Sequence, residues 1–194
     1  MRKIKKILSY FWYYLWGNIL FIFLYDKKYY RSKHFKSRYF NITAQGWRWV
    51  LNDFRSRLFL GVNRGVPFPI SPFNTIGKTS NLIFDVDDLH NFQGKGKYFQ
   101  TYKEGKIYIG ENSYIASNVG LITANHDIKN LEEHAESKDI IIGENSWIGM
   151  NSVVLPGIVL GDNTIVGAGS IVTKSFSKGN VIIAGNPAKI IRYL

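Results

Sequence analysis

The chain has 194 residues and no cysteine, and its 25 Lys and Arg against 14 Asp and Glu give a formal net charge of +11. A hydrophobic content of 45% excludes disorder throughout, and the missing cysteines exclude a disulfide framework, a thiol nucleophile and a Cys-ligated metal. The length fits one domain with an appendage.

The charge is concentrated at the N-terminus. Residues 1–57 hold 13 of the Lys and Arg but only Asp26 and Asp53 among the acids, whereas residues 58–194 hold 12 of each sign. Residues 1–60 also hold 18 of the 30 aromatic residues and four of the five Trp. We therefore predict a basic, aromatic N-terminal region over residues 1–66, followed by a neutral body over residues 67–194.

An apolar run fills residues 7–25 and predicts a helix about 28 Å long, close to the thickness of a bilayer core. We expect this run to be retained, because it is longer and more aromatic than that of a signal peptide and no small-residue cleavage site follows it. Three interpretations stay open. The helix spans a membrane, lies on a membrane, or packs against the protein's own body or another subunit.

The composition of this region favours the membrane surface. Five Trp and Tyr lie within residues 10–16, and these side chains prefer the headgroup interface. Cations flank the run on both sides and would each gain roughly 1 kcal/mol near an anionic leaflet. The uninterrupted apolar run argues against a nucleic-acid partner. We predict that residues 1–38 bind a membrane, with the cations Arg2, Lys3, Lys5, Lys6, Lys27, Lys28, Arg31, Lys33, Lys36 and Arg38.

In the body, an aliphatic residue returns every six positions. This period suits neither a 3.6-residue helix nor a hairpin sheet, but it is typical of a solenoid whose triangular coils contain three short strands and 18 residues. Ile76 and Leu82 keep the same spacing, so the solenoid begins before Ile109, although residues 87–106 are irregular. The residues expected to point inward are Ile109, Ile115, Leu121, Ile142, Ile148, Val154, Leu160, Val166 and Val172.

Three segments resemble the hexapeptide-repeat acyltransferases, with most similarity to the O-acetyltransferases of bacterial capsule, exopolysaccharide and lipopolysaccharide synthesis. These segments are residues 107–127 (IYIGENSYIASNVGLITANHD), residues 140–176 and residues 184–192 (AGNPAKIIR). The resemblance covers about residues 67–194 and implies a mainly β fold, a left-handed parallel β-helix with a short C-terminal tail at residues 179–194. It also implies acetyl-CoA as co-substrate, no metal, and a homotrimer.

The chemistry is expected where the repeat is interrupted. The hexad 121–126 ends at His126, and residues 127–139 then leave the coil as a polar loop. Histidine is a common general base near neutral pH, and the matched histidine of the family has that role, which the resemblance assigns to His126. Asp127 is a candidate to orient the ring, although neighbours along an extended chain point to opposite faces. His34 and His90 are interpreted as surface or structural residues. His134 is interpreted as a solvated residue of the loop, with contact to the acceptor as the minor alternative.

For the donor, the resemblance implies acetyl-CoA in the groove between coils of neighbouring subunits. Small residues at Gly149, Ala168 and Gly169 would allow the pantetheine arm to approach the backbone. Trp147 matches an aromatic position near the donor, with a packing role as the alternative. The expected donor-binding residues are Trp147, Gly149, Met150, Ala168, Gly169, Thr173, Lys174, Lys189 and Arg192, of which the last four match positions that meet the CoA phosphates.

The acceptor site is less defined. Relatives hold the acceptor partly through an amide side chain upstream of the histidine, and Gln100 is its match here, with Asn125 beside the catalytic position. Tyr98 and Tyr102 could stack on a sugar. Asp85, Asp87 and Asp88 could bind sugar hydroxyls, but solvated acids are the commoner explanation.

The resemblance predicts an O-acetyltransferase that acetylates a bacterial surface polysaccharide or its lipid-linked precursor, on the cytoplasmic face of the inner membrane. The main alternative is an N- or O-acetyltransferase for a small soluble sugar or amino acid. A metal-dependent carbonic anhydrase on the same solenoid needs three histidine ligands, which the spacing of His126 and His134 disfavours. A non-catalytic scaffold is the third alternative.

Overall fold

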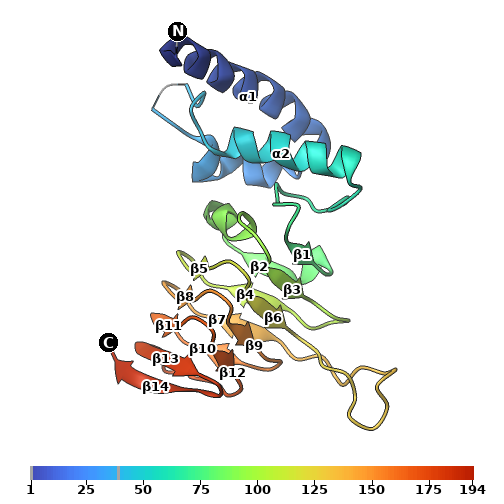
Figure 1. Cartoon of the computed structure of the whole chain (residues 1–194), viewed down its shortest axis with the longest axis vertical. Coiled ribbons are helices and arrows are strands. Elements are labelled where there is room, and N and C mark those ends of the chain that lie inside the picture. The colour runs from blue at the N-terminus through green and yellow to red at the C-terminus, as the bar shows by residue number, and fades with distance from the viewer. Residues whose placement is uncertain (1, 39) are drawn as a thin grey trace. The chain divides into compact units, whose positions relative to one another are not determined.

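The computed structural model describes residues 2–38 and 40–194 and contains two compact units, Met1–Pro72 and Phe73–Leu194 (Figure 1). Residues 1 and 39 of the predicted N-terminal region lie outside the described residues. Residues 67–72 fold with the first unit. Arg57 holds this segment by donating to the carbonyls of Val66 and Phe68, at 2.8 and 3.3 Å.

The first unit is built around two helices that pack on each other. The predicted N-terminal helix is present, and one of its faces contacts the second helix at Gly17, where an added Cβ would lie 3.0 Å from a ring carbon of Trp47. The aromatic core consists of Phe21, Phe35 and Trp47, all fully buried. The elements are α1 (Arg2–Leu24), η1 (Lys27–Arg31), η2 (Lys33–Phe35) and α2 (Gly46–Phe59).

A buried polar cluster fixes the C-terminal end of α1 to α2. The hydroxyl of Tyr25 donates to Asp53 at 2.8 Å, and Arg57 donates to the same carboxylate oxygen at 2.9 Å. The amide of Ile70 also donates to Asp53. Burial raises the pKa of Tyr25 above its ordinary value, so its hydroxyl stays protonated and keeps the hydrogen bond to Asp53.

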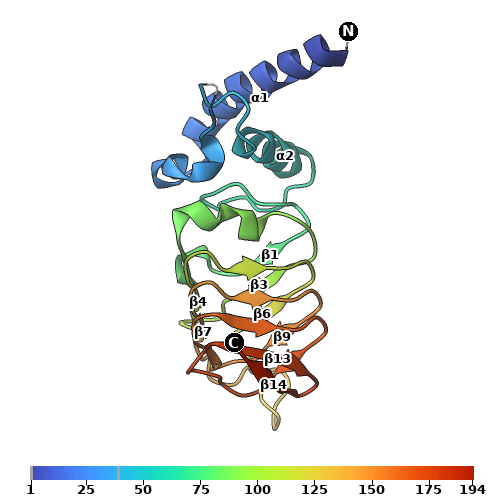
Figure 2. The ribbon, with the colours of Figure 1, turned by 90° about the vertical axis from the view of Figure 1, so that its left-hand side faces the viewer.

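The second unit is a parallel β-helix whose short strands stack into three sheets (Figure 2). The first sheet contains β1 (Thr75–Ile76), β3 (Tyr98–Gln100), β6 (Gly120–Ile122), β9 (Val153–Val154) and β12 (Ile171–Val172). The second contains β2 (Leu82–Phe84), β4 (Ile107–Ile109), β7 (Ile140–Ile142) and β10 (Val159–Leu160). The third contains β5 (Tyr114–Ile115), β8 (Trp147–Ile148), β11 (Thr164–Val166), β13 (Val181–Gly185) and β14 (Ala188–Tyr193).

The aliphatic residues of the six-residue repeat fill the interior, as predicted. All nine are at most 4% exposed, and equivalents pair across coils, as Ile109 does with Ile142. Asparagines make the turns between strands, and Asn112, Asn145 and Asn163 adopt positive φ. Asparagine tolerates this left-handed conformation better than most side chains, which explains the Glu-Asn and Asp-Asn pairs of the repeat.

The first coil begins upstream of Ile109, as predicted, but one of its sides differs. The irregular stretch contains the short helix η4 (Val86–Phe92), which follows η3 (Thr79–Asn81) and β2. Asn91 of η4 takes the position of a strand, because its side chain donates to the carbonyl of Ser113 and accepts from the amide of Ile115. At the other end, β13 and β14 form an antiparallel hairpin whose turn contains a cis Asn186–Pro187 bond.

Candidate active site

The interruption of the repeat is a hairpin that extends from the solenoid between β6 and β7 (Figure 1). His126 and His134 face each other across it as an antiparallel pair. The amide of Asp127 donates to the carbonyl of Glu133, and the amide of Ala135 donates to the carbonyl of Asn125, both at 2.9 Å. These bonds hold His126 at the base of the hairpin, where the loop leaves the rigid coil.

The imidazole of His126 is oriented by the backbone. Its Nδ1 lies 2.7 Å from the carbonyl oxygen of Leu131, in the same hairpin. A carbonyl oxygen only accepts hydrogen bonds, so Nδ1 carries the proton in this contact and Nε2 of the neutral ring has the free lone pair. The His126 side chain is exposed. The geometry therefore presents a proton acceptor to solvent.

The carboxylate of Asp127 binds backbone amides of the loop and not the ring of His126. Its Oδ1 accepts from the amide of Lys129 at 2.7 Å and from the amide of Asn130 at 3.3 Å, which closes a turn inside the loop. The contact to Nδ1 of His126 comes instead from Leu131. Asp127 thus shapes the loop that supplies the orienting carbonyl.

Three rings lie in a row beside this site. The ring of His134 is stacked on Tyr102, with centroids 4.2 Å apart, and lies 4.4 Å from the ring of His126 on its other side. The side chain of Lys103 lies over the ring of Tyr102, with its Nζ 5.5 Å from the ring centroid. His134, interpreted from the sequence as a solvated loop residue with acceptor contact as the alternative, is half-buried and packs between other rings next to the candidate base.

The predicted acceptor residues lie on the coils around the hairpin. Gln100 of β3 pairs in register with Ile122 of β6, and its Oε1 accepts from the amide of Ala124 at 3.2 Å. Asn125 is exposed at the hairpin base. Asp88, in contrast, is buried and accepts from the amide of Asn112, which is a structural role.

The predicted donor residues around Gly149 lie together at one corner, between the third and first sheets. The amide of Gly169 donates to the carbonyl of Met150 at 2.8 Å, which joins successive coils there. A Cβ at Gly149 would lie 2.6 Å from the carbonyl oxygen of Val166 and 2.7 Å from the amide nitrogen of Ala168. The next coil fills the space at Gly149, whereas no atom lies within 4 Å of a Cβ built at Gly169. Of these two glycines, Gly169 leaves open space for a ligand.

The other predicted donor residues lie elsewhere on the coil. Trp147 is exposed on β8 of the third sheet, and Lys189 and Arg192 lie on β14 of the same sheet. Thr173 and Lys174 follow β12 of the first sheet and are exposed. Thr173 and Lys174 therefore share with His126 the corner between the first and second sheets. Among the described residues, no group of three His, Cys, Asp or Glu is placed to hold a metal ion.

Residues 139–174 match the family model of the bacterial transferase hexapeptide (six repeats). This match and the parallel sheets confirm the hexapeptide repeat and the fold class predicted from the sequence. The matched residues span the coils from β7 to β12 and include the corner at Gly149 and Ala168.

Known proteins similar to the chain are named as acetyltransferases. A Dictyostelium discoideum protein is 54% identical to this chain over 89 residues, which are 44% of this chain and 46% of that protein, and it is provisionally named an acetyltransferase. A provisionally named colanic acid biosynthesis acetyltransferase of Escherichia coli K12 is 38% identical over 104 residues, 54% of this chain and 57% of that protein. The chain thus spans about half the length of these relatives.

A solved structure also supports the hexapeptide-repeat fold of the chain. The hexapeptide-repeat acetyltransferase of Vibrio cholerae O1 biovar eltor, in complex with acetyl coenzyme A, is 26% identical to this chain with a TM-score of 0.53. The similarity covers 63% of this chain and 65% of that protein.

Proposed function

We propose that the chain is an acetyl-CoA-dependent O-acetyltransferase that acetylates a hydroxyl of a bacterial surface polysaccharide or its lipid-linked precursor. The observation that carries this proposal is the orientation of His126, an exposed residue whose Nδ1 is held by the Leu131 carbonyl at 2.7 Å. Acetyl-CoA in the Vibrio cholerae structure supports the donor, and the name of the colanic acid relative supports the acceptor class.

The reaction needs one proton acceptor and no covalent intermediate. Nε2 of His126 takes the proton of the acceptor hydroxyl as that oxygen forms a bond to the thioester carbonyl carbon. The carbon–sulfur bond then breaks, and the departing CoA thiolate receives the proton from His126. The products are an acetyl ester and CoA.

The first prediction tests this role. His126→Ala should lower the rate of acetyl transfer by roughly 10²- to 10⁴-fold, because general-base assistance is worth that much. Circular dichroism and CoA binding should be unchanged. Glu136→Ala, at an exposed position of the same loop, is the matched control and should keep full activity. Near-normal turnover by His126→Ala would refute the assignment.

The alternative acceptor is distinguished by the product. With labelled acetyl-CoA, an acetyl ester is released by mild alkali, whereas the amide made by an N-acetyltransferase survives. An alkali-stable product, or transfer only to small soluble sugars or amino acids, would favour the alternative function and exclude the polysaccharide.

We also propose that the chain works at the cytoplasmic face of the inner membrane. The segment Lys5–Leu24 is long and apolar enough to cross a membrane by length and composition, and only 11% of it is buried within the structure. The unit Met1–Pro72 carries 14 of the Lys and Arg but two acids, which favours anionic lipid. The proposal requires the full chain to co-sediment with anionic vesicles and much less with zwitterionic ones.

A further inference from the structure

Helix α1 has one packed face and one bare face, and both are apolar. Gly17 and Phe21 are buried against α2 and its surroundings, and the ring of Tyr14 lies edge-on to Trp47 at 5.5 Å. The opposite half of the helix, here called the outer face, is at least 40% exposed at every large residue. An exposed apolar face of this size marks an interaction surface. Its residues are Ile7, Leu8, Phe11, Trp12, Leu15, Trp16, Ile19, Ile22 and Phe23.

The C-terminal end of α2 continues this surface. Leu58, Phe59 and Leu60 are exposed at 56%, 77% and 67%. A groove of about 380 Å³ joins them to α1, because Trp12 and Trp16 of the outer face line it together with Leu58 and Phe59. Arg55 is the one charged residue in the lining. The two helices therefore present one continuous apolar surface.

The packing of α1 on α2 is inconsistent with a transmembrane α1. The contact between Gly17 and Trp47 lies at the middle of the apolar run, which would be the bilayer centre in a spanning helix. Arg48, Asn52 and Arg55 are exposed on α2 and would enter the hydrocarbon with it. Charged side chains are strongly disfavoured there.

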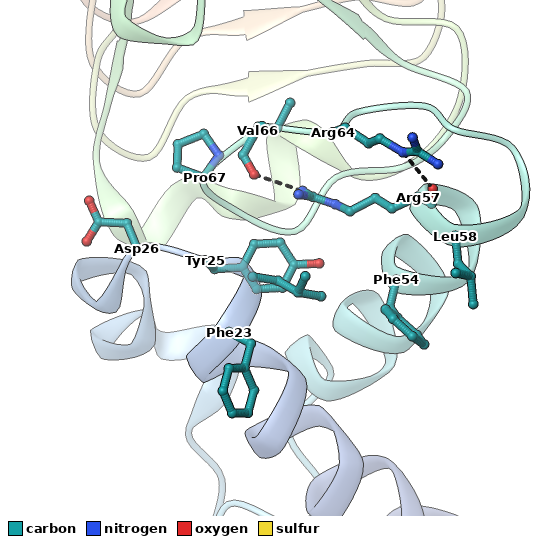
Figure 3. A pocket seen from close by; sticks show the side chains of 11 residues that line it. Phe23, Tyr25, Asp26, Phe54, Arg57, Leu58, Arg64, Val66 and Pro67 are labelled. Atoms are coloured by element: carbon teal, nitrogen blue, oxygen red, sulfur yellow. Dashed lines mark hydrogen bonds between the residues drawn. The ribbon is translucent and has the colours of Figure 1, made fainter.

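Detaching α1 from α2 would disrupt buried polar contacts. Tyr25 and Arg57 both donate to the carboxylate of Asp53. Arg57 also donates to the Val66 carbonyl in the wall of a cavity at the end of α1 (Figure 3). Arg64 adds a hydrogen bond from its Nε to the carbonyl of Arg57. Removal of α1 would leave a buried carboxylate without one of its donors, which is unfavourable.

We propose that the outer face of α1 and the C-terminal end of α2 insert together into one leaflet of an anionic membrane, with α1 lying in the plane of the interface. Trp12 and Trp16 on this face suit the headgroup region. The net positive charge of Met1–Pro72 attracts anionic lipid but opposes close packing of a second copy through the same surface. This inference rests on the proposed membrane location and is independent of the proposed acetyl transfer.

The chain has no cysteine, so single-cysteine variants give site-specific fluorescent labels for a depth measurement. We would label Leu15→Cys, Phe59→Cys and Asn52→Cys of the full chain and measure quenching by lipids brominated at different depths, in phosphatidylcholine–phosphatidylglycerol vesicles. The labels at residues 15 and 59 should lie at the same shallow depth, with the label at 52, about two turns nearer the N-terminal end of α2, closer to the water. A label at 15 in the bilayer centre with the one at 59 in water would show a span and overturn the inference.

A binding assay tests the contribution of α2. The triple variant Leu58→Ser, Phe59→Ser and Leu60→Ser should bind these vesicles at least tenfold more weakly, whereas Ile128→Ser with Ile191→Ser, exposed in the second unit, should bind like the parent. Equal binding by the triple variant would refute the role of α2. Failure of the parent chain to bind would refute the membrane location as well, while acetyl transfer to a soluble acceptor would still report on the catalytic proposal.

Discussion

At the residue scale, Lys97 is a buried cation near the start of the solenoid. It is 5% exposed, and its Nζ donates to the carbonyl of Asn91 at 2.7 Å. Burial lowers the pKa of Lys97 from 10.5 to about 8. Between these two values the unfolded chain binds a proton that the folded chain has lost. The free energy of unfolding should therefore rise with pH from about 8 to about 10, by at most about 1.4 kcal/mol per pH unit.

Urea unfolding at a series of pH values, followed by circular dichroism, measures this slope. Lys97→Met should remove that part of the slope whatever its effect on absolute stability, because the buried group no longer titrates. Lys78→Met, at an exposed position, is the matched control and should keep the parent slope. If Lys97→Met and the parent show the same pH dependence, Lys97 does not titrate in that window.

The candidate base could be located from the sequence, but its surroundings could not. His126 ends a hexad just before the repeat is interrupted, so its place is fixed by local periodicity. The Leu131 carbonyl and the ring of His134 reach it through the register of the hairpin, which is set by backbone hydrogen bonds inside a loop without a repeat. Tyr102 joins them from another coil, 32 residues before His134.

At the element scale, the stacking of coils depends on glycines that admit the next coil. A Cβ at Gly149 would lie 2.6 Å from a backbone oxygen, which cannot move without separating the coils. We expect Gly149→Ala to destabilise the solenoid by about 1–3 kcal/mol, the usual range for overpacking. Thermal and urea unfolding measure this loss.

Gly120→Ala is the matched control, because its new Cβ would meet the side chain of Val153 at an ordinary 3.6 Å. This variant should be neutral or slightly more stable, since alanine reduces the entropy of the unfolded chain. Equal losses in the two variants would mean that coil contact at Gly149 is not the cause.

The six-residue period predicted most of the solenoid and failed where side chains replace strands. Strands β4 to β6 and β7 to β12 follow the spacing, because each inward aliphatic residue must stack on its equivalent in the coil before it. In the first coil, the side chain of Asn91 makes the hydrogen bonds that a strand backbone would make. A side chain that takes the place of a strand leaves no periodic signal in the sequence.

At the scale of the whole molecule, the N-terminal helix packs on the protein and also leaves an apolar face exposed. Two of the interpretations that the sequence left open are therefore compatible. The sequence allowed packing on the protein's own body or contact with a membrane, and α1 uses one face to pack on α2 while its outer face is exposed. Hydropathy could not separate these faces, because α1 is apolar on both.

We propose that the donor site combines residues of two neighbouring chains. His126 lies at the corner between the first and second sheets, whereas Gly149 and Ala168 lie at the corner between the third and first. One whole side of the triangular coil separates them in one chain, and a neighbouring copy can bring the two corners together. We propose a homotrimer, whose mass in light scattering should be about three times 22.3 kDa.

Mixed trimers provide the corresponding functional prediction. His126→Ala removes the base, and Ala168→Trp should block the donor groove at an exposed position. Each variant alone should be inactive. When the two are co-expressed in equal amounts, random assembly leaves about a quarter of the sites with both native residues, supplied by adjacent subunits. The mixture should therefore recover about a quarter of the parent activity, whereas a site contained in a single chain would recover none.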